Sequence, residues 1–128
     1  MAKASLFLLL LAVSSRPVSL SKVFTSTPNI EAEEGDTAEF DCFYSPDFTN
    51  PRIEWKFRKL DGSESVIYLN GAVTDAYKDR VDFFNPEMIL HKVTSKDSGT
   101  YVCQVAKTSP PSMSGTALIK LSVQDSKT

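Results

Sequence analysis

Histidine and cysteine are scarce in this sequence. Its 128 residues include a single histidine and two cysteines, and they contain no glycine-rich motif of the kind that cradles phosphates. The histidine, His91, falls on the polar side of an expected strand, and no catalytic triad can be assembled around it. The acidic run from Glu31 to Asp36 lacks the regular ligand spacing of a calcium-binding loop. We therefore predict a non-enzymatic binding protein without a metal ion or cofactor.

An excess of positive charge is also missing. The 14 lysine and arginine residues are outweighed by 16 aspartate and glutamate residues, so the formal net charge is −2. A protein that binds nucleic acid needs a basic surface to neutralise phosphates. This charge balance argues against nucleic acid as a partner.

Long apolar runs are absent except near the N-terminus. The run from Leu6 to Val13 follows Lys3 and precedes small residues and Pro17, which is the layout of a secretory signal peptide. The run is shorter than the roughly 20 residues that span a membrane. We predict a signal peptide over residues 1–21 and no membrane span in this chain. The expected location is extracellular: at the cell surface if the chain is part of a longer receptor, and secreted otherwise.

The two cysteines, Cys42 and Cys103, allow only one intramolecular pairing. An exported protein reaches an oxidising compartment, where such a pair forms a lasting disulfide. Closing a loop of this length restricts the unfolded chain by about 4 kcal/mol in the loop-entropy description. The sequence therefore predicts one disulfide that joins distant parts of a single domain.

The remaining chain is built from short segments that alternate between apolar and polar residues. The clearest, residues 51–57, places Ile53, Trp55 and Phe57 on one face and charged residues on the other. Nothing has the 3.6-residue period of a substantial helix. Further strands are expected at residues 23–27, 30–32, 37–44, 65–69, 72–74, 80–84, 88–93, 100–106 and 116–123, with proline-containing loops at 45–51 and 108–115. The pattern predicts an all-β sandwich or barrel.

The segment Asp97-Ser98-Gly99-Thr100-Tyr101-Val102-Cys103 resembles the Asp-x-Gly-x-Tyr-x-Cys motif of variable-type immunoglobulin domains. This resemblance implies a variable-type two-sheet sandwich over residues 22–125 with one inter-sheet disulfide, followed by a polar tail at residues 126–128. It also implies three structural contacts. Trp55 packs on the disulfide, the Tyr101 hydroxyl bonds back to the preceding turn, and Asp97 forms a salt bridge with Arg80.

In such a sandwich the outward face of the strand with Arg52 is a candidate interaction surface. Arg52 and Glu54 lie two residues apart and project from one face, so two copies related by a two-fold axis could exchange ion pairs. The residues alone also allow a solvated charged surface, because exposed ion pairs are weak. The predicted interface residues are Arg52, Glu54, Lys56, Tyr68, Val102, Gln104 and Leu118.

The tripeptide Arg52-Ile53-Glu54 is similar to the Arg-(Val/Ile/Leu)-Glu dimerisation motif of the junctional adhesion molecules, and the similarity continues through residues 77–83 and 93–101. The resemblance implies the membrane-distal domain of a cell-surface adhesion protein at cell junctions. Such a domain would bind itself, or a related immunoglobulin-family adhesion protein, through this sheet. Gln104 departs from the family pattern, because an apolar residue is expected at its position.

A second hypothesis is an immune-type receptor, or a soluble variable-type domain, that binds a heterologous ligand through its loops. The contact loops would be residues 45–51 and 107–115. Apart from Tyr44 and Phe48, these regions lack the aromatic anchors that are typical of antibody binding sites.

Overall fold

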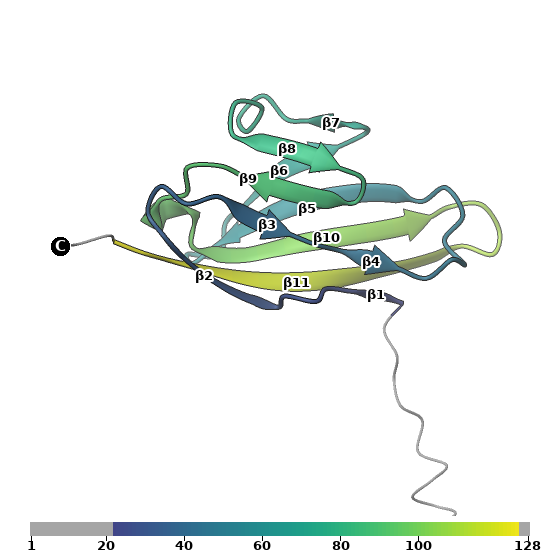
Figure 1. Ribbon diagram of the computed structural model, residues 1–128. Coiled ribbons are helices and arrows are strands. Elements are labelled where there is room, and N and C mark those ends of the chain that lie inside the picture. Colours follow the sequence, from purple (N-terminus) through teal and green to yellow (C-terminus); the bar gives the residue numbers. More distant parts are fainter. Residues whose placement is uncertain (1–21, 126–128) are drawn as a thin grey trace, which may run out of the picture.

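The computed structural model describes residues 22–125 (Figure 1). The predicted signal peptide, residues 1–21, and the C-terminal residues 126–128 lie outside this part. The strands are β1 (Val23–Phe24), β2 (Asn29–Glu33), β3 (Ala38–Phe40), β4 (Phe43–Tyr44), β5 (Arg52–Lys59), β6 (Glu64–Leu69), β7 (Ala72–Val73), β8 (Val81–Phe84), β9 (Glu87–Leu90), β10 (Gly99–Lys107) and β11 (Met113–Gln124). One short 3-10 helix, η1 (Ser95–Asp97), precedes β10. The predicted all-β class is confirmed.

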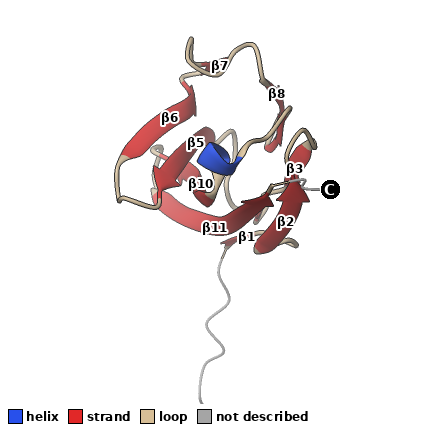
Figure 2. Cartoon of the chain, turned by 90° about the vertical axis from the view of Figure 1, so that its left-hand side faces the viewer, coloured by secondary structure: helices blue, strands red, loops and turns tan. Residues whose placement is uncertain are grey.

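Two sheets face each other across the core, as Figures 1 and 2 show. The larger sheet has six strands in the order β2-β11-β10-β5-β6-β7, and the smaller has three in the order β3-β9-β8. Neighbouring strands are antiparallel except for β2 and β11, which are parallel. A separate short pair joins β1 to β4. This is the predicted sandwich, and β5 and β10 lie at the centre of its larger sheet.

The core is organised around the disulfide between Cys42 and Cys103, which confirms the predicted pairing. Trp55 is aligned with Cys103 in the β5–β10 ladder and is fully buried. Its indole N–H donates a hydrogen bond of 2.9 Å to the carbonyl oxygen of Pro86, and its ring meets Phe40 edge-on. A buried indole that is left without a partner would cost about 1–3 kcal/mol, so this bond keeps Trp55 compatible with the core.

A hydrogen-bonded cluster closes one end of the sandwich. The Arg80 guanidinium donates to both carboxylate oxygens of Asp97, at 2.7 and 2.9 Å, which confirms the predicted salt bridge. The hydroxyl of Tyr101 donates to the backbone carbonyl of Asp97 at 2.6 Å, as predicted. Burial, together with the negative charge of Asp97, raises the pKa of the Tyr101 hydroxyl, so the group remains a neutral donor.

Several strand boundaries differ from the prediction, and two of the differences have a clear structural cause. Residues 37–44 do not form one strand, because β3 pairs with β9 whereas β4 pairs with β1. Between them, Asp41 accepts hydrogen bonds from Thr25 and Ser26. The last strand begins at Met113 and not at 116, because the β10–β11 hairpin remains paired as far as Lys107 and Met113. The predicted loop at 108–115 therefore shortens to residues 108–112.

Gly99 should be the glycine least tolerant of substitution. A Cβ at Gly99 would lie 2.6 Å from the Arg58 carbonyl oxygen and 2.7 Å from the Phe57 ring, at a φ of +151°. Gly71 also has a positive φ, +83°, but its Cβ would meet nothing within 4 Å. Gly71→Ala should therefore cost about 1 kcal/mol from backbone strain, and Gly99→Ala should cost about 2 kcal/mol more from overlap. Urea unfolding of both variants measures the difference, and equal losses would contradict the close approach.

Candidate protein-interaction face

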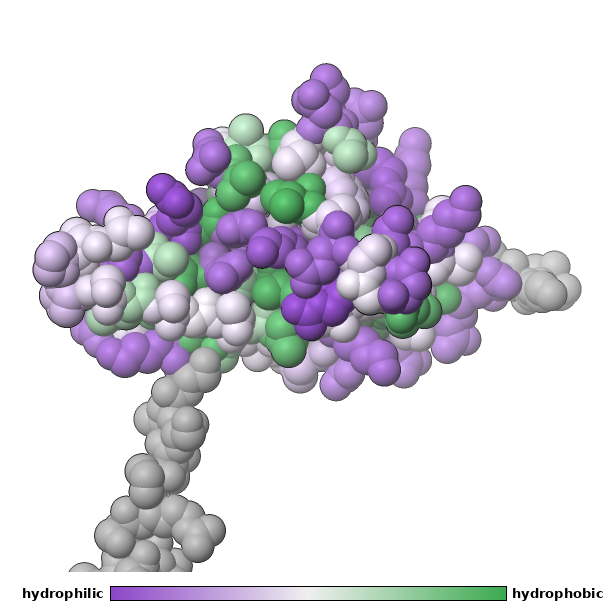
Figure 3. Space-filling model, turned by 180° about the vertical axis from the view of Figure 1, so that it is seen from behind, coloured by the Kyte–Doolittle hydropathy of each residue, from purple (hydrophilic) through white to green (hydrophobic). Residues whose placement is uncertain are grey.

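Side chains on the outer side of β5, β10 and β11 form rows that cross the sheet. The ladders align Arg52 with Ala106, and they align Glu54 with Gln104 in the next row. Gln104 is aligned in turn with Thr116 on β11. We name this surface the outer face and define it by Arg52, Glu54, Lys56, Val102, Gln104 and Leu118. Seen from behind, this side of the molecule is mainly polar, with small apolar areas between the polar side chains (Figure 3).

Some of the charged side chains on this side of β5 form ion pairs with neighbours, and one does not. Glu54 lies 3.6 Å from Lys56, and their side chains are 21% and 30% exposed. Arg58, further along β5, is paired with Glu64 at 3.0 Å. Arg52 is exposed and makes no ion pair with any residue from 22 to 125. The face therefore presents one free guanidinium beside a carboxylate whose single local contact is longer than a normal hydrogen bond.

Apolar area on the outer face comes mainly from Leu118, which is 51% exposed. Val102, which was also predicted to be exposed there, is only 6% exposed, although it lies outside the main core cluster. It is flanked in the ladders by Lys56 and Leu118, and long side chains on neighbouring strands shield a short one between them. Val102 thus forms the floor of the face.

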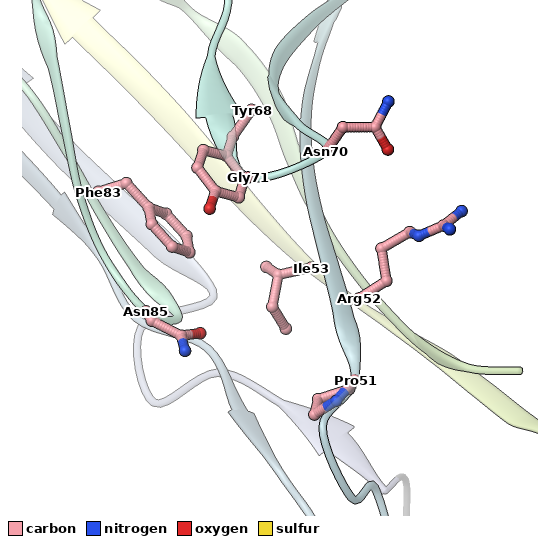
Figure 4. A pocket seen from close by; sticks show the side chains of 8 residues that line it. All are labelled: Pro51, Arg52, Ile53, Tyr68, Asn70, Gly71, Phe83 and Asn85. Carbon is pink, nitrogen blue, oxygen red and sulfur yellow. The ribbon is translucent and has the colours of Figure 1, made fainter. Parts of the chain in front are cut away.

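Tyr68 points to the other side of the sheet, so its predicted place in the interface is wrong. A bulge in the β5–β6 ladder aligns Trp55 with Tyr68 and leaves Ile67 without a partner on β5. Aligned residues point to the same side, so Tyr68 faces inward with Trp55 and stacks on Phe83 with ring centroids 3.7 Å apart (Figure 4). One extra residue reverses the alternation of a strand, so Tyr68 turns inward, whereas Val66 is aligned with Lys56 and faces outward.

A second polar cluster was missed by reasoning from the sequence. The Nε2 atom of His91 lies 2.8 Å from an Asp82 carboxylate oxygen, and its Nδ1 atom lies 3.4 Å from the Thr37 hydroxyl. All three side chains are in contact with solvent, so water competes for every hydrogen bond in the cluster. The β8–β9 register brings Asp82 and His91 together, and no local sequence signal indicates that register. The cluster lies on the solvent-facing side of the smaller sheet, apart from the outer face.

Two other kinds of site are not found in the described part of the chain. Within residues 22–125, no three His, Cys, Asp or Glu side chains are grouped so that they could hold a metal ion. No helix in this range is long and apolar enough to cross a membrane.

Comparison with known proteins defines the class first. Residues 25–124 match the immunoglobulin V-set domain family, and the chain belongs to that family. Within it, the chain is a V-type domain of the junctional adhesion molecule family. It is 42% identical to junctional adhesion molecule A of Felis catus over 94 residues, and 35% identical to that of Homo sapiens over 102 residues. Both the V-set family and these adhesion molecules are non-enzymatic.

The matched regions cover 73% and 80% of this chain but 31% and 33% of the two relatives, so the chain spans about a third of their length. Myelin protein zero-like protein 2 of Mus musculus is 32% identical over 84% of this chain and 56% of its own length. A structure described as the basis of T cell specificity and activation by toxic shock syndrome toxin-1 superimposes with a TM-score of 0.66. It covers 82% of this chain and all of its own at 16% identity, and the likeness shows the fold alone.

The stacking of Tyr68 on Phe83 can be tested by a double-mutant cycle. Tyr68→Ala and Phe83→Ala should each destabilise the domain, and the coupling between them should be about 0.5–1.5 kcal/mol, as for other aromatic pairs. Unfolding in urea gives the four stabilities. A coupling near zero, or weakened self-association of Tyr68→Ala at full stability, would instead place this ring on the outer face.

Proposed function

We propose that this chain is an extracellular adhesion module that binds a second copy of itself through the outer face. The main support for this proposal is that Arg52 is exposed and makes no ion pair within residues 22–125. It lies two positions from Glu54, on the same side of β5. Relatives named junctional adhesion molecules support an adhesive role. We further propose that residues 1–21 direct export, that residues 22–125 form the module, and that it acts at the cell surface as part of a longer receptor.

The geometry suits a two-fold contact between identical copies. With the axis passing between Arg52 and Glu54, each guanidinium meets the partner's carboxylate, and the two ion pairs form together. A guanidinium can bond both oxygens of a carboxylate, which restricts the relative orientation of the two copies. The loose contact between Glu54 and Lys56 leaves the carboxylate able to accept these bonds.

Residues around the ion pairs set the strength of the contact. Leu118 supplies exposed apolar area, and Val102, which is aligned with it, is buried beneath the neighbouring side chains. Gln104 stands beside Glu54 and brings a carboxamide into the centre of the proposed interface. Burying that amide without a partner costs free energy, so the dimer should be weak. A weak contact suffices for adhesion when many copies on two membranes bind at once.

Charge reversal tests the proposed dimer. Arg52→Glu places like charges opposite each other at both symmetric contacts, so the dissociation constant should rise about tenfold or more. Adding Glu54→Arg restores complementarity with the signs exchanged, and self-association should partly recover. Sedimentation velocity at several protein concentrations measures both effects.

Arg58→Glu is the matched control, because Arg58 lies on the same strand but is already paired with Glu64. It should leave the dimer nearly unchanged. A dimer that survives Arg52→Glu would exclude the proposed contact. A monomeric protein that binds a heterologous ligand through residues 45–51 and 107–115 would favour a receptor of the immune type.

Gln104 offers a second test in the opposite direction. Gln104→Leu removes the amide and adds apolar area at the centre of the face, so self-association should strengthen about tenfold. Gln124→Leu makes the same substitution at the end of β11, outside the residues that define the outer face, and serves as the control. An unchanged dissociation constant for Gln104→Leu would show that this position lies outside the contact.

A further inference from the structure

The four asparagines of this chain differ in the residue that follows them. Asn50 and Asn85 precede proline, and Asn29 precedes a β-branched isoleucine inside β2, whereas Asn70 precedes Gly71 in the exposed β6–β7 turn. An asparagine loses its amide when the backbone nitrogen of the next residue attacks its side-chain carbonyl. A proline nitrogen carries no hydrogen and is blocked by its ring, and a β-branched neighbour hinders the attack. Asn70 alone has an unhindered neighbour.

The β6–β7 turn leaves room for this attack. Asn70 and Gly71 both have a positive φ, of 52° and 83°. A Cβ placed on Gly71 would meet nothing within 4 Å, so the turn stands clear of other groups on that side. The Gly71 amide donates no hydrogen bond to any residue from 22 to 125. Its nitrogen can therefore approach the Asn70 side chain without breaking a bond of the fold.

The turn with Asp61 and Gly62 provides a comparison within the same chain. Aspartate can form the same five-membered ring, but it does so as the neutral acid, because a carboxylate has no good leaving group. The Asp61 carboxylate accepts hydrogen bonds from the backbone N–H and the hydroxyl of Ser63, at 2.9 and 2.7 Å. These bonds lower the pKa of the Asp61 carboxyl and so disfavour the neutral acid. Asn70, as an amide, has no such protection.

The reaction at Asn70 consumes only water. The Gly71 nitrogen bonds to the side-chain carbonyl carbon, the bond from that carbon to the amide nitrogen breaks, and ammonia leaves with the proton of the Gly71 N–H. Water then opens the cyclic imide at one of its two carbonyl carbons. One opening gives aspartate and the other gives isoaspartate. In either case an amide and a water become a carboxylate and an ammonium ion.

The new carboxylate would arise beside Arg52. Antiparallel pairing of β5 with β6 brings the β6–β7 turn to the start of β5, and both Arg52 and Asn70 line the cavity there. Figure 4 shows their side chains on the same side of β5, with Ile53 on the other. Arg52 has no ion pair within residues 22–125 that would compete. We propose that Asn70 is a site of spontaneous deamidation, whose product pairs with Arg52 and weakens the two-fold contact.

The effect on self-association rests on the proposed function. A carboxylate at position 70 competes with Glu54 of the second copy for the Arg52 guanidinium, and it also repels that glutamate. Each copy carries its own turn beside its own Arg52, so the two symmetric contacts are weakened together. Older molecules would then adhere more weakly than newly made ones, without the action of an enzyme.

Mass spectrometry tests the modification. The protein is incubated in mildly alkaline buffer, which favours the deprotonated attacking nitrogen. The peptide with Asn70 should gain the mass difference between an amide and an acid, and isoaspartyl methyltransferase should label it. Asn70→Gln keeps the carboxamide but needs a six-membered ring, so it should stay unmodified. An Asn70 that keeps its amide, or that converts no faster than Asn29, would overturn the proposal.

Asn70→Asp installs one of the two products directly, and aspartate tolerates a positive φ as asparagine does. Its dissociation constant for self-association should be about tenfold higher than that of the parent protein, because two contacts are weakened at once. Gln124→Glu makes the same amide-to-acid change at the end of β11 and should leave the constant unchanged. Sedimentation velocity compares them. Equal constants for the two variants would refute competition at Arg52, and melting temperatures verify that each variant is folded.

The pairing with Arg52 can also be measured in the monomer. The carboxyl introduced by Asn70→Asp should have a lower pKa when Arg52 is present than when Arg52→Ala is added, because a guanidinium favours the charged form. NMR titration of dilute protein gives both values, and equal values would overturn the pairing. A parent protein that is monomeric at every concentration would instead reject the proposed function and the effect on association. The mass and pKa measurements decide the modification and the pairing in either case.

Discussion

The disulfide between Cys42 and Cys103 joins the two sheets, and Trp55 is aligned with Cys103 directly beside it. Trp55 must therefore point into the core, and a strand turns successive side chains to opposite sides. Glu54 and Lys56 must then point outward. The β5–β10 ladder extends this constraint across the sheet, so that Gln104 joins Glu54 in one row. The composition of the outer face is thus a consequence of how the core is packed.

Most of the fold could be predicted from the sequence, because the signals were local or tied to covalent chemistry. Alternation identified β5, two cysteines allowed one bridge, and the segment from Asp97 to Cys103 carried a motif whose members each have a structural task. The Arg80 salt bridge and the Tyr101 hydrogen bond were found as expected. These features depend on which residues are present and on their spacing, and both can be read directly from the sequence.

The remaining details depend on register and on shielding by neighbours, which spacing does not encode. A single unpaired residue, Ile67, turns Tyr68 inward, and nothing in residues 64–69 marks the bulge. Val102 lies on the predicted side but is covered by the side chains of the adjacent strands. The pairing of Asp82 with His91 follows from the β8–β9 ladder in the same way. Each of these three differences arises from contacts between neighbouring strands.

Arg52 lies on the outer face, and its lack of an ion pair within residues 22–125 is what makes the proposed contact with a second copy possible. Arg58, on the same strand, is held by Glu64 and so is less available to a ligand. A similar local carboxylate beside Arg52 would add little stability, because exposed ion pairs contribute about 0–1 kcal/mol. It would, however, compete with a partner's carboxylate for the guanidinium. Leaving Arg52 unpaired within residues 22–125 therefore costs the fold almost nothing and keeps its full hydrogen-bonding capacity for an external carboxylate.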